Sequence, residues 1–220
     1  PGTGKSVIAI NLLAKILNNG FTCFYVTKTS APRTTFSKSL IRGEHTISYL
    51  KGLFKSSGTF YDVPTNTFDC LLVDEAHRLN AKSGLFSNIG ENQIKEIINA
   101  CKISVFFIDE DQIISTKDIG SVAEIKKWAK QLGSKVHYGD NLKLLSQFRC
   151  NGSDGYLAFL DDVLQIRNTA NYNWFDLNYD IQFFNDPLEM REALRKTNIN
   201  NKSRMIAGYC YPWNSSKDKS

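Results

Sequence analysis

The fold of this chain is constrained most by its first six residues, Pro1-Gly2-Thr3-Gly4-Lys5-Ser6. They match the end of a phosphate-binding loop, G-x-x-x-x-G-K-[ST], whose glycines let backbone N–H groups face the phosphates of a nucleotide. The lysine of this pattern reaches the β- and γ-phosphates, and the last hydroxyl ligates Mg²⁺. Helical spacing over residues 7–17 predicts a helix whose N-terminus favours negative charge. We therefore predict a nucleotide-binding site formed by Gly2, Thr3, Gly4, Lys5 and Ser6.

The same motif indicates what precedes the chain. A phosphate-binding loop follows a buried strand, and the first glycine of the pattern would fall just before Pro1. We therefore expect these 220 residues to be part of a longer protein. We also expect them to be poorly stable alone, because the strand before the loop is a central one.

The order of elements predicts the fold class. Short apolar runs predict buried strands at residues 22–27, 68–73 and 103–108. Further helices are predicted at residues 34–41, 47–54, 91–100, 121–132, 155–166 and 187–196, and shorter strands at 136–138, 142–145, 181–184 and 204–210. Strands that alternate with helices predict an α/β fold, with a mostly parallel sheet and helices on both faces.

Composition and charge narrow the class of protein. No apolar run approaches the roughly 20 residues of a membrane-spanning helix, so we expect an intracellular, cytoplasmic protein without a membrane partner. Five scattered cysteines predict buried thiols rather than disulfides or a metal site. Between residues 28 and 61 lie six Lys or Arg and one acid, which leaves 21 basic and 21 acidic residues elsewhere. This segment suits a nucleic-acid backbone, although charge alone allows a solvated face equally well.

Acidic residues follow two of the predicted strands. Asp74 and Glu75 come directly after residues 68–73, at the strand end where α/β sheets bind ligands. Downstream of a phosphate-binding loop, such an Asp holds Mg²⁺ and such a Glu deprotonates the attacking water. The next strand ends in Asp109-Glu110-Asp111-Gln112, where the Gln112 amide can contact the γ-phosphate or the water. The sequence thus predicts ATP and Mg²⁺ as ligands, with Ser6 and Asp74 on the metal.

One arginine completes this set. Arg149 follows a predicted short strand and can offer a bidentate fork to the transferring phosphoryl group. A surface arginine is an equal alternative when Arg149 is considered alone. For His77, just past the acids, two interpretations stay open: a relay toward Gln112, or a polar residue at the start of a helix.

In this order and spacing, the motifs resemble motifs I to IV of superfamily 1 helicases. The amino-acid sequence of the motifs and their flanks resembles the Schlafen group 3-like DNA/RNA helicase domain family over nearly the whole chain. The stretches that carry the resemblance are PGTGKSVIAINLLA, LLVDEAHRL, FFIDEDQ, LSQFRCNGSDGYLAFLD and RMIAGYCYPW. The letters D-E-A-H also occur in superfamily 2 helicases. Those proteins carry Ser-Ala-Thr as their third motif, where this chain has Asp109 and Gln112, so we set that alternative aside.

The resemblance implies a RecA-like P-loop NTPase lobe at residues 1–180, and the beginning of a second lobe, or a linker to it, at 181–220. It implies catalytic or phosphate-sensing roles for Lys5, Glu75, Gln112 and Arg149. It also implies that single-stranded DNA or RNA is a partner, contacted through Thr27, Lys28, Thr29 and Arg33. Ile108 and Phe148 replace a glycine and a tyrosine common in superfamily 1, without removal of a needed functional group.

The expected function is ATP hydrolysis coupled to nucleic acid, as in a helicase or translocase. The alternative is an ATP-driven switch that recruits a protein partner without unwinding. A nucleic-acid-binding module with a dead ATPase site is disfavoured, because Lys5, Asp74 and Glu75 are all present.

Overall fold

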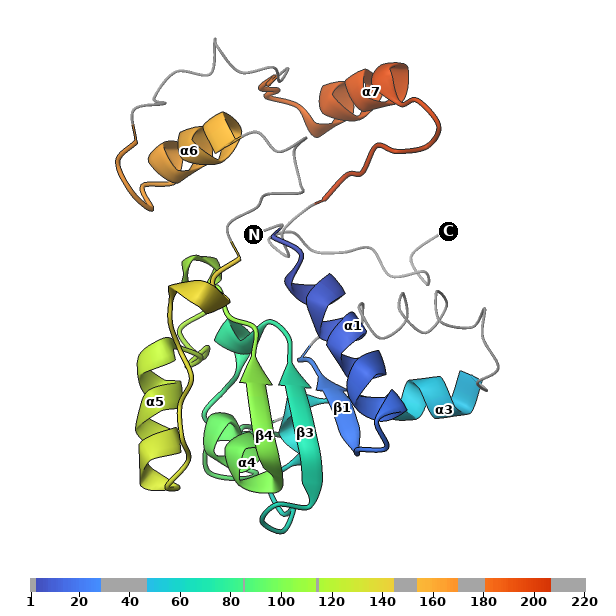
Figure 1. Ribbon diagram of the computed structural model, residues 1–220. Helices are drawn as coiled ribbons and strands as arrows, with labels where there is room; N and C mark the ends of the chain where they lie inside the picture. Colours follow the sequence, from blue (N-terminus) through green and yellow to red (C-terminus); the bar gives the residue numbers. More distant parts are fainter. Residues whose placement is uncertain are drawn as a thin grey trace.

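The computed structural model describes residues 3–28, 47–84, 86–113, 115–144, 154–169 and 181–206. Within them the chain is an α/β structure with a four-stranded sheet in the order β2-β1-β3-β4, and every pairing is parallel (Figure 1). The strands are β1 (Cys23–Val26), β2 (Phe54–Lys55), β3 (Phe68–Val73) and β4 (Cys101–Phe106).

The described helices are α1 (Lys5–Asn18), α3 (Ile47–Gly52), α4 (Gln93–Ala100), α5 (Val122–Gln131), α6 (Asp154–Val163) and α7 (Pro187–Thr197). Three of them begin at side-chain caps, because Asn92, Ser121 and Asp186 each accept a hydrogen bond from the first turn. Among the described helices, none is both long and apolar enough to cross a bilayer.

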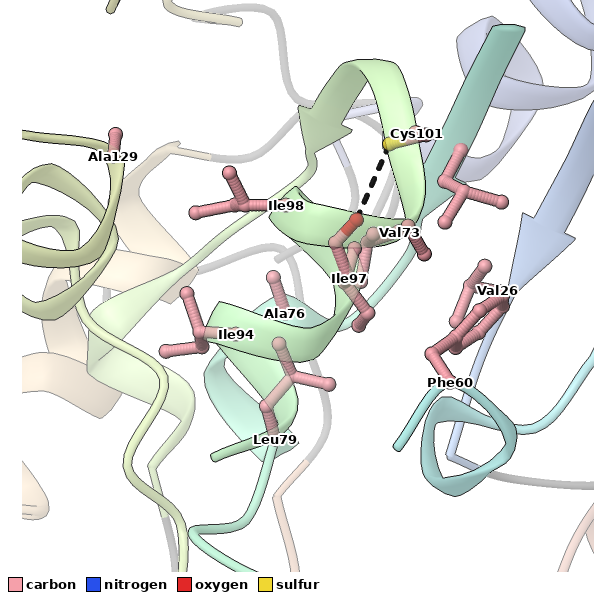
Figure 2. Close-up of a cluster of buried hydrophobic side chains, with 12 residues drawn as sticks. Val26, Phe60, Val73, Ala76, Leu79, Ile94, Ile97, Ile98, Cys101 and Ala129 are labelled. Atoms are coloured by element: carbon pink, nitrogen blue, oxygen red, sulfur yellow. Dashed lines mark hydrogen bonds between the residues drawn. The ribbon is translucent and has the colours of Figure 1, made fainter. Parts of the chain in front are cut away.

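One face of the sheet packs against α4 and α5. Val26, Leu71 and Val73 are fully buried there, together with Ile97 of α4 and Ala129 of α5. Figure 2 shows Ile94, Ile97 and Ile98 of α4 in one cluster with Ala76 and Leu79 from the turn that follows β3. The Cys101 thiol donates to the carbonyl oxygen of Ile97 at 3.2 Å. Through Ala76 and Leu79, this cluster fixes the position of the turn that follows β3.

The other face of the sheet packs against α1. Tyr25 and Leu72, which alternate with the residues of the first cluster, are fully buried against Ala9 and Leu13 of α1. The cover on this face is incomplete at β4, where Ile103, which pairs with Cys70, is 61% exposed. The predicted α/β class, parallel sheet and helices on both faces are confirmed for the described residues.

The strand predicted at residues 68–73 is β3 with the same bounds, and those at 22–27 and 103–108 correspond to β1 and β4. The predicted helices at residues 7–17, 91–100, 121–132, 155–166 and 187–196 correspond to α1, α4, α5, α6 and α7. Their ends differ from the prediction by at most three residues. Cys23, Cys70 and Cys101 are buried free thiols, as predicted. The helix predicted at 34–41 lies outside the described residues, as do Cys150 and Cys210.

The helix predicted at residues 47–54 is present as α3 with a shorter C-terminal end, whereas other predicted elements are wrong. The helix predicted at residues 47–54 ends at Gly52, because Phe54 pairs with Tyr25 and begins β2. Residues 136–138 and 181–184 form no strand, and Leu142 lies in a 3-10 turn. Residues of β-forming type form a strand only when their backbone pairs with a neighbouring strand and their side chains pack against other residues. Phe183, in one of the segments that form no strand, is 87% exposed. Residues 204–206 are also irregular, and the rest of that predicted strand is not described.

The strands end at one edge, where the first turn of α1 also lies (Figure 1). Backbone hydrogen bonds extend the sheet past the strands, from Asp74 N–H to the Val26 oxygen at 2.9 Å and from Phe107 N–H to the Val73 oxygen at 2.8 Å. The N–H of Ala76 then donates to the Phe107 oxygen at 2.9 Å. These bonds hold the segments after β3 and β4 side by side, and every described residue of the predicted phosphate site lies at this edge.

Candidate functional site

The N-terminus of α1 forms one wall of the site. Gly4 occupies the N-cap position with φ 81°, a left-handed conformation that favours glycine. Lys5 and Ser6 are the first residues of the helix, where backbone N–H groups lack partners within the helix. Thr3 is described beside them, and Gly2 lies outside the described residues. The geometry suits an anion at this end of the helix.

Ser6 meets the first acid of the loop after β3. Its hydroxyl donates to Asp74 Oδ2 at 2.7 Å, across 68 positions of sequence. The Tyr25 hydroxyl, from β1, donates to the same oxygen, and Glu75 N–H donates to Oδ1 at 3.1 Å. Asp74 is 2% exposed, so these donors compensate for its burial. Burial and the hydrogen bond to Asp74 raise the pKa of Tyr25 far above its ordinary value, so its hydroxyl remains a donor.

Lys5 meets the acid after β4. Its Nζ lies 3.0 Å from Asp109 Oδ2, and the same oxygen accepts from Gln112 Nε2 at 2.7 Å. Gln112 N–H also donates to the Asp109 carbonyl oxygen at 3.1 Å, which fixes the 3-10 turn Glu110–Gln112. The structure thus places Lys5 and Gln112 on one carboxylate.

Glu75 has an unusual backbone for a side-chain-bearing residue. Its φ of 53° and ψ of 45° are left-handed, a conformation that costs about 1–3 kcal/mol and is concentrated at functional sites. Its carboxylate oxygen Oε2 lies 2.9 Å from His77 Nε2. Because a carboxylate can only accept, Nε2 carries the hydrogen of this contact.

His77 is 1% exposed, and its Nδ1 has no hydrogen-bond partner among the described residues. Burial lowers the pKa of His77 below its ordinary value, against the opposing pull of the Glu75 charge. A neutral imidazole therefore lies behind Glu75 and orients its carboxylate.

The predicted nucleic-acid contacts are only partly described. Thr27 is 1% exposed, at the end of β1, whereas the side chain of Lys28 is 30% exposed. Thr29, Arg33 and the predicted finger Arg149 lie outside the described residues. Of the four predicted contacts, Lys28 is thus the described one with an accessible charge.

Sequence reasoning missed three contacts of this site. Tyr25 carries no motif signal, because its role follows from strand alternation and from the pairing of β1 with β3. Asp109 was expected only as part of a motif with Gln112, and its contact with Lys5 was not anticipated. The partner of His77 is Glu75, which neither of the two open interpretations named.

A comparison with protein families bears on this geometry. Residues 1–220 match the family described as Schlafen group 3, DNA/RNA helicase domain. The chain belongs to this family. The resemblance predicted from the motifs is therefore confirmed, and membership associates the chain with nucleic-acid-related activity.

The Schlafen group 3 domain also has a relative among curated proteins. The Saccharomyces cerevisiae (strain ATCC 204508 / S288c) protein named Uncharacterized protein YPL245W is 27% identical, over a stretch that covers 66% of this chain and 36% of that protein. The matched part of this chain thus spans about a third of that relative. No solved structure matches the chain.

Proposed function

We propose that this chain is the RecA-like P-loop lobe of a superfamily 1-type DNA/RNA helicase or translocase, which hydrolyses ATP in response to single-stranded nucleic acid. One observation carries the proposal: the Ser6 hydroxyl lies 2.7 Å from Asp74, although 68 positions separate them. This contact supports the proposal because it joins the motif of the predicted phosphate-binding loop to the predicted metal ligand at one edge of the sheet. Residues 1–180 would form this lobe, and 181–220 the start of a second lobe or the linker to it.

The donor set fits Mg²⁺. Asp74 and Ser6 supply a carboxylate and a hydroxyl oxygen, and Mg²⁺ is commonly held by one or two protein oxygens together with water and substrate phosphates. Tyr25 donates to the same carboxylate and keeps it oriented. When bound, the metal would neutralise charge on the β- and γ-phosphates.

The remaining residues support phosphoryl transfer to water. The α1 N-terminus and Lys5 would bind the phosphates, with Lys5 turning from Asp109 toward them. Glu75, oriented by His77, would accept the proton of the attacking water as the bond to the γ-phosphorus forms and the bond to the leaving oxygen breaks. Gln112 would hold the water or a γ-phosphate oxygen.

The nucleic-acid part of the proposal is supported by family membership and by the basic segment that begins at Lys28. A chain that tracks a phosphate backbone binds it through displaced counterions, so its response weakens as salt rises. The test is the rate of ATP turnover by the intact protein with and without single-stranded DNA or RNA, at low and at moderate salt.

A further inference from the structure

A buried carboxylate joins Lys28 to the loop that carries Glu75. The side chain of Asp118, between β4 and α5, is fully buried at 0% exposure. Its Oδ1 accepts a hydrogen bond from Lys28 Nζ at 3.0 Å, and its Oδ2 lies 3.0 Å from Arg78 Nε. One negative charge therefore holds two cationic groups, one from the end of β1 and one from the 3-10 turn after Glu75.

The position of this carboxylate is fixed by backbone contacts. Asp118 forms an isolated β-bridge with Asn80, and Ile119 N–H donates to the Leu79 oxygen at 2.7 Å. Gly120 then packs against the backbone of the turn at Ala76. The segment from Asp118 to Gly120 and the turn Ala76–Arg78 are therefore one rigid unit.

The two cationic side chains are partly exposed, and Lys28 keeps one ammonium hydrogen without a partner among the described residues, whereas the Arg78 Nε atom is buried. Among the described residues, two of the three ammonium hydrogens of Lys28 are used, by Asp118 and by Asn80 Oδ1 at 3.0 Å. The Arg78 Nε–Asp118 Oδ2 contact lacks hydrogen-bond geometry, and both atoms are unsatisfied in the described part of the chain. The side chains of Lys28 and Arg78 are 30% and 27% exposed. Two positive charges against one buried negative charge leave a surplus that attracts an anion.

We propose that Asp118 is a positioning residue that holds Lys28 and Arg78 as a paired site for one phosphate of a single-stranded nucleic acid. The proposal rests on the proposed function and adds to it a physical link between the bound nucleic-acid strand and the loop that carries Glu75. Arg78 lies three residues after Glu75, so a phosphate at this pair stabilises the catalytic loop in the conformation described here. Neither Arg78 nor Asp118 was predicted as a nucleic-acid contact from the sequence.

The test is equilibrium binding of a fluorescent oligothymidine by the intact protein over a range of salt concentrations. The log–log salt dependence should lose about 0.7 in slope for each lost phosphate contact on a single strand. We expect this loss in Lys28→Ala, in Arg78→Ala, and to no greater extent in the double variant, because both residues serve one phosphate. Lys102→Ala is the matched control, since the Lys102 side chain is 63% exposed and pairs with Asp69.

The Asp118→Asn variant tests whether nucleic-acid binding becomes stronger or weaker when the negative charge of Asp118 is removed. Removal of a negative charge near a basic site strengthens polyanion binding by long-range electrostatics alone. If Asp118 positions the two cations, binding instead weakens by about two- to tenfold for each side chain that becomes mobile. A thermal melt of each variant separates this loss from unfolding, and the Lys28 and Arg78 variants decide the question if Asp118→Asn fails to fold.

Three results overturn the inference alone. The first is equal salt slopes for Lys28→Ala and Lys102→Ala, and the second is tighter binding by folded Asp118→Asn. The third is a lowered melting temperature with unchanged binding in the Lys28, Arg78 and Asp118 variants, because such a result shows that the ion pairs are purely structural. If the wild-type protein binds no single strand at all, the nucleic-acid part of the proposed function fails as well, while its ATP turnover is judged separately.

Discussion

Replacement of Gly120 by alanine tests whether the turn after β3 is held as rigidly as the structure indicates. A Cβ at this position would lie 1.8 Å from the Ala76 carbonyl oxygen and 2.6 Å from His77 Cα. These are backbone atoms and cannot rotate away as a side chain does, so the turn itself must move. Overpacking of this kind costs about 1–3 kcal/mol, occasionally more, and we expect the upper end of that range.

The displaced turn carries Glu75, so Gly120→Ala should also slow ATP hydrolysis. A misplacement of about 1 Å at a catalytic group can lower the rate by about 100-fold. The assays are thermal unfolding, with a shift of about 2–4 °C per kcal/mol for a chain of this size, and steady-state ATP turnover. Gly52→Ala is the matched control, because a Cβ at Gly52 meets nothing within 4 Å.

The outcome that refutes this reasoning is a Gly120→Ala protein with the stability and turnover of Gly52→Ala. Loss of stability with full turnover would show that the turn moves without displacing Glu75. That result would separate the packing argument from the catalytic one.

Two further predictions concern groups buried around the site. Tyr25→Phe removes a donor to the buried Asp74 carboxylate and should lower the free energy of unfolding, measured by urea denaturation, by about 1.5–3 kcal/mol. Tyr61→Phe is the control, because Tyr61 is 48% exposed and its replacement should leave that free energy unchanged. Equal effects of the two variants would contradict this prediction. Because burial lowers the pKa of His77 below 6.5, the unfolded chain takes up its proton first as pH falls, so stability is retained above pH 6.5 and lost below it. His77→Asn should therefore show a smaller loss of stability on acidification than the wild-type protein, and a parallel loss in both would refute this assignment.

The sequence predicted elements well where burial alone determines the structure. Five of the six residues of β3 are apolar and its last four are buried, so its bounds were predictable without knowledge of its neighbours. Residues 136–138 also include β-forming side chains, but in the described part of the chain they pair with no strand. β2 was missed for the opposite reason, since Phe54 is a strand residue only because Tyr25 lies beside it.

In the candidate site, too, some residues are visible in the local sequence and others are placed only by the fold. Lys5, Ser6 and Asp74 belong to local motifs with a known chemistry, and the structure places Ser6 on Asp74 and Lys5 on Asp109. Tyr25 and Asp118 belong to none, and their contacts join residues 49 and 90 positions apart. Such contacts follow from strand register and loop path, which no local pattern encodes.

We propose that this edge of the sheet hydrolyses ATP in response to single-stranded nucleic acid. The most direct measurement is steady-state ATP turnover by the intact protein, with and without single-stranded DNA or RNA, at low and at moderate salt, with Glu75→Gln as the baseline. The account predicts a several-fold stimulation that declines as salt rises and is absent in Glu75→Gln. Turnover that is indifferent to nucleic acid, or that persists in Glu75→Gln, would contradict it; the first result would favour an ATP-driven switch that acts on a protein partner.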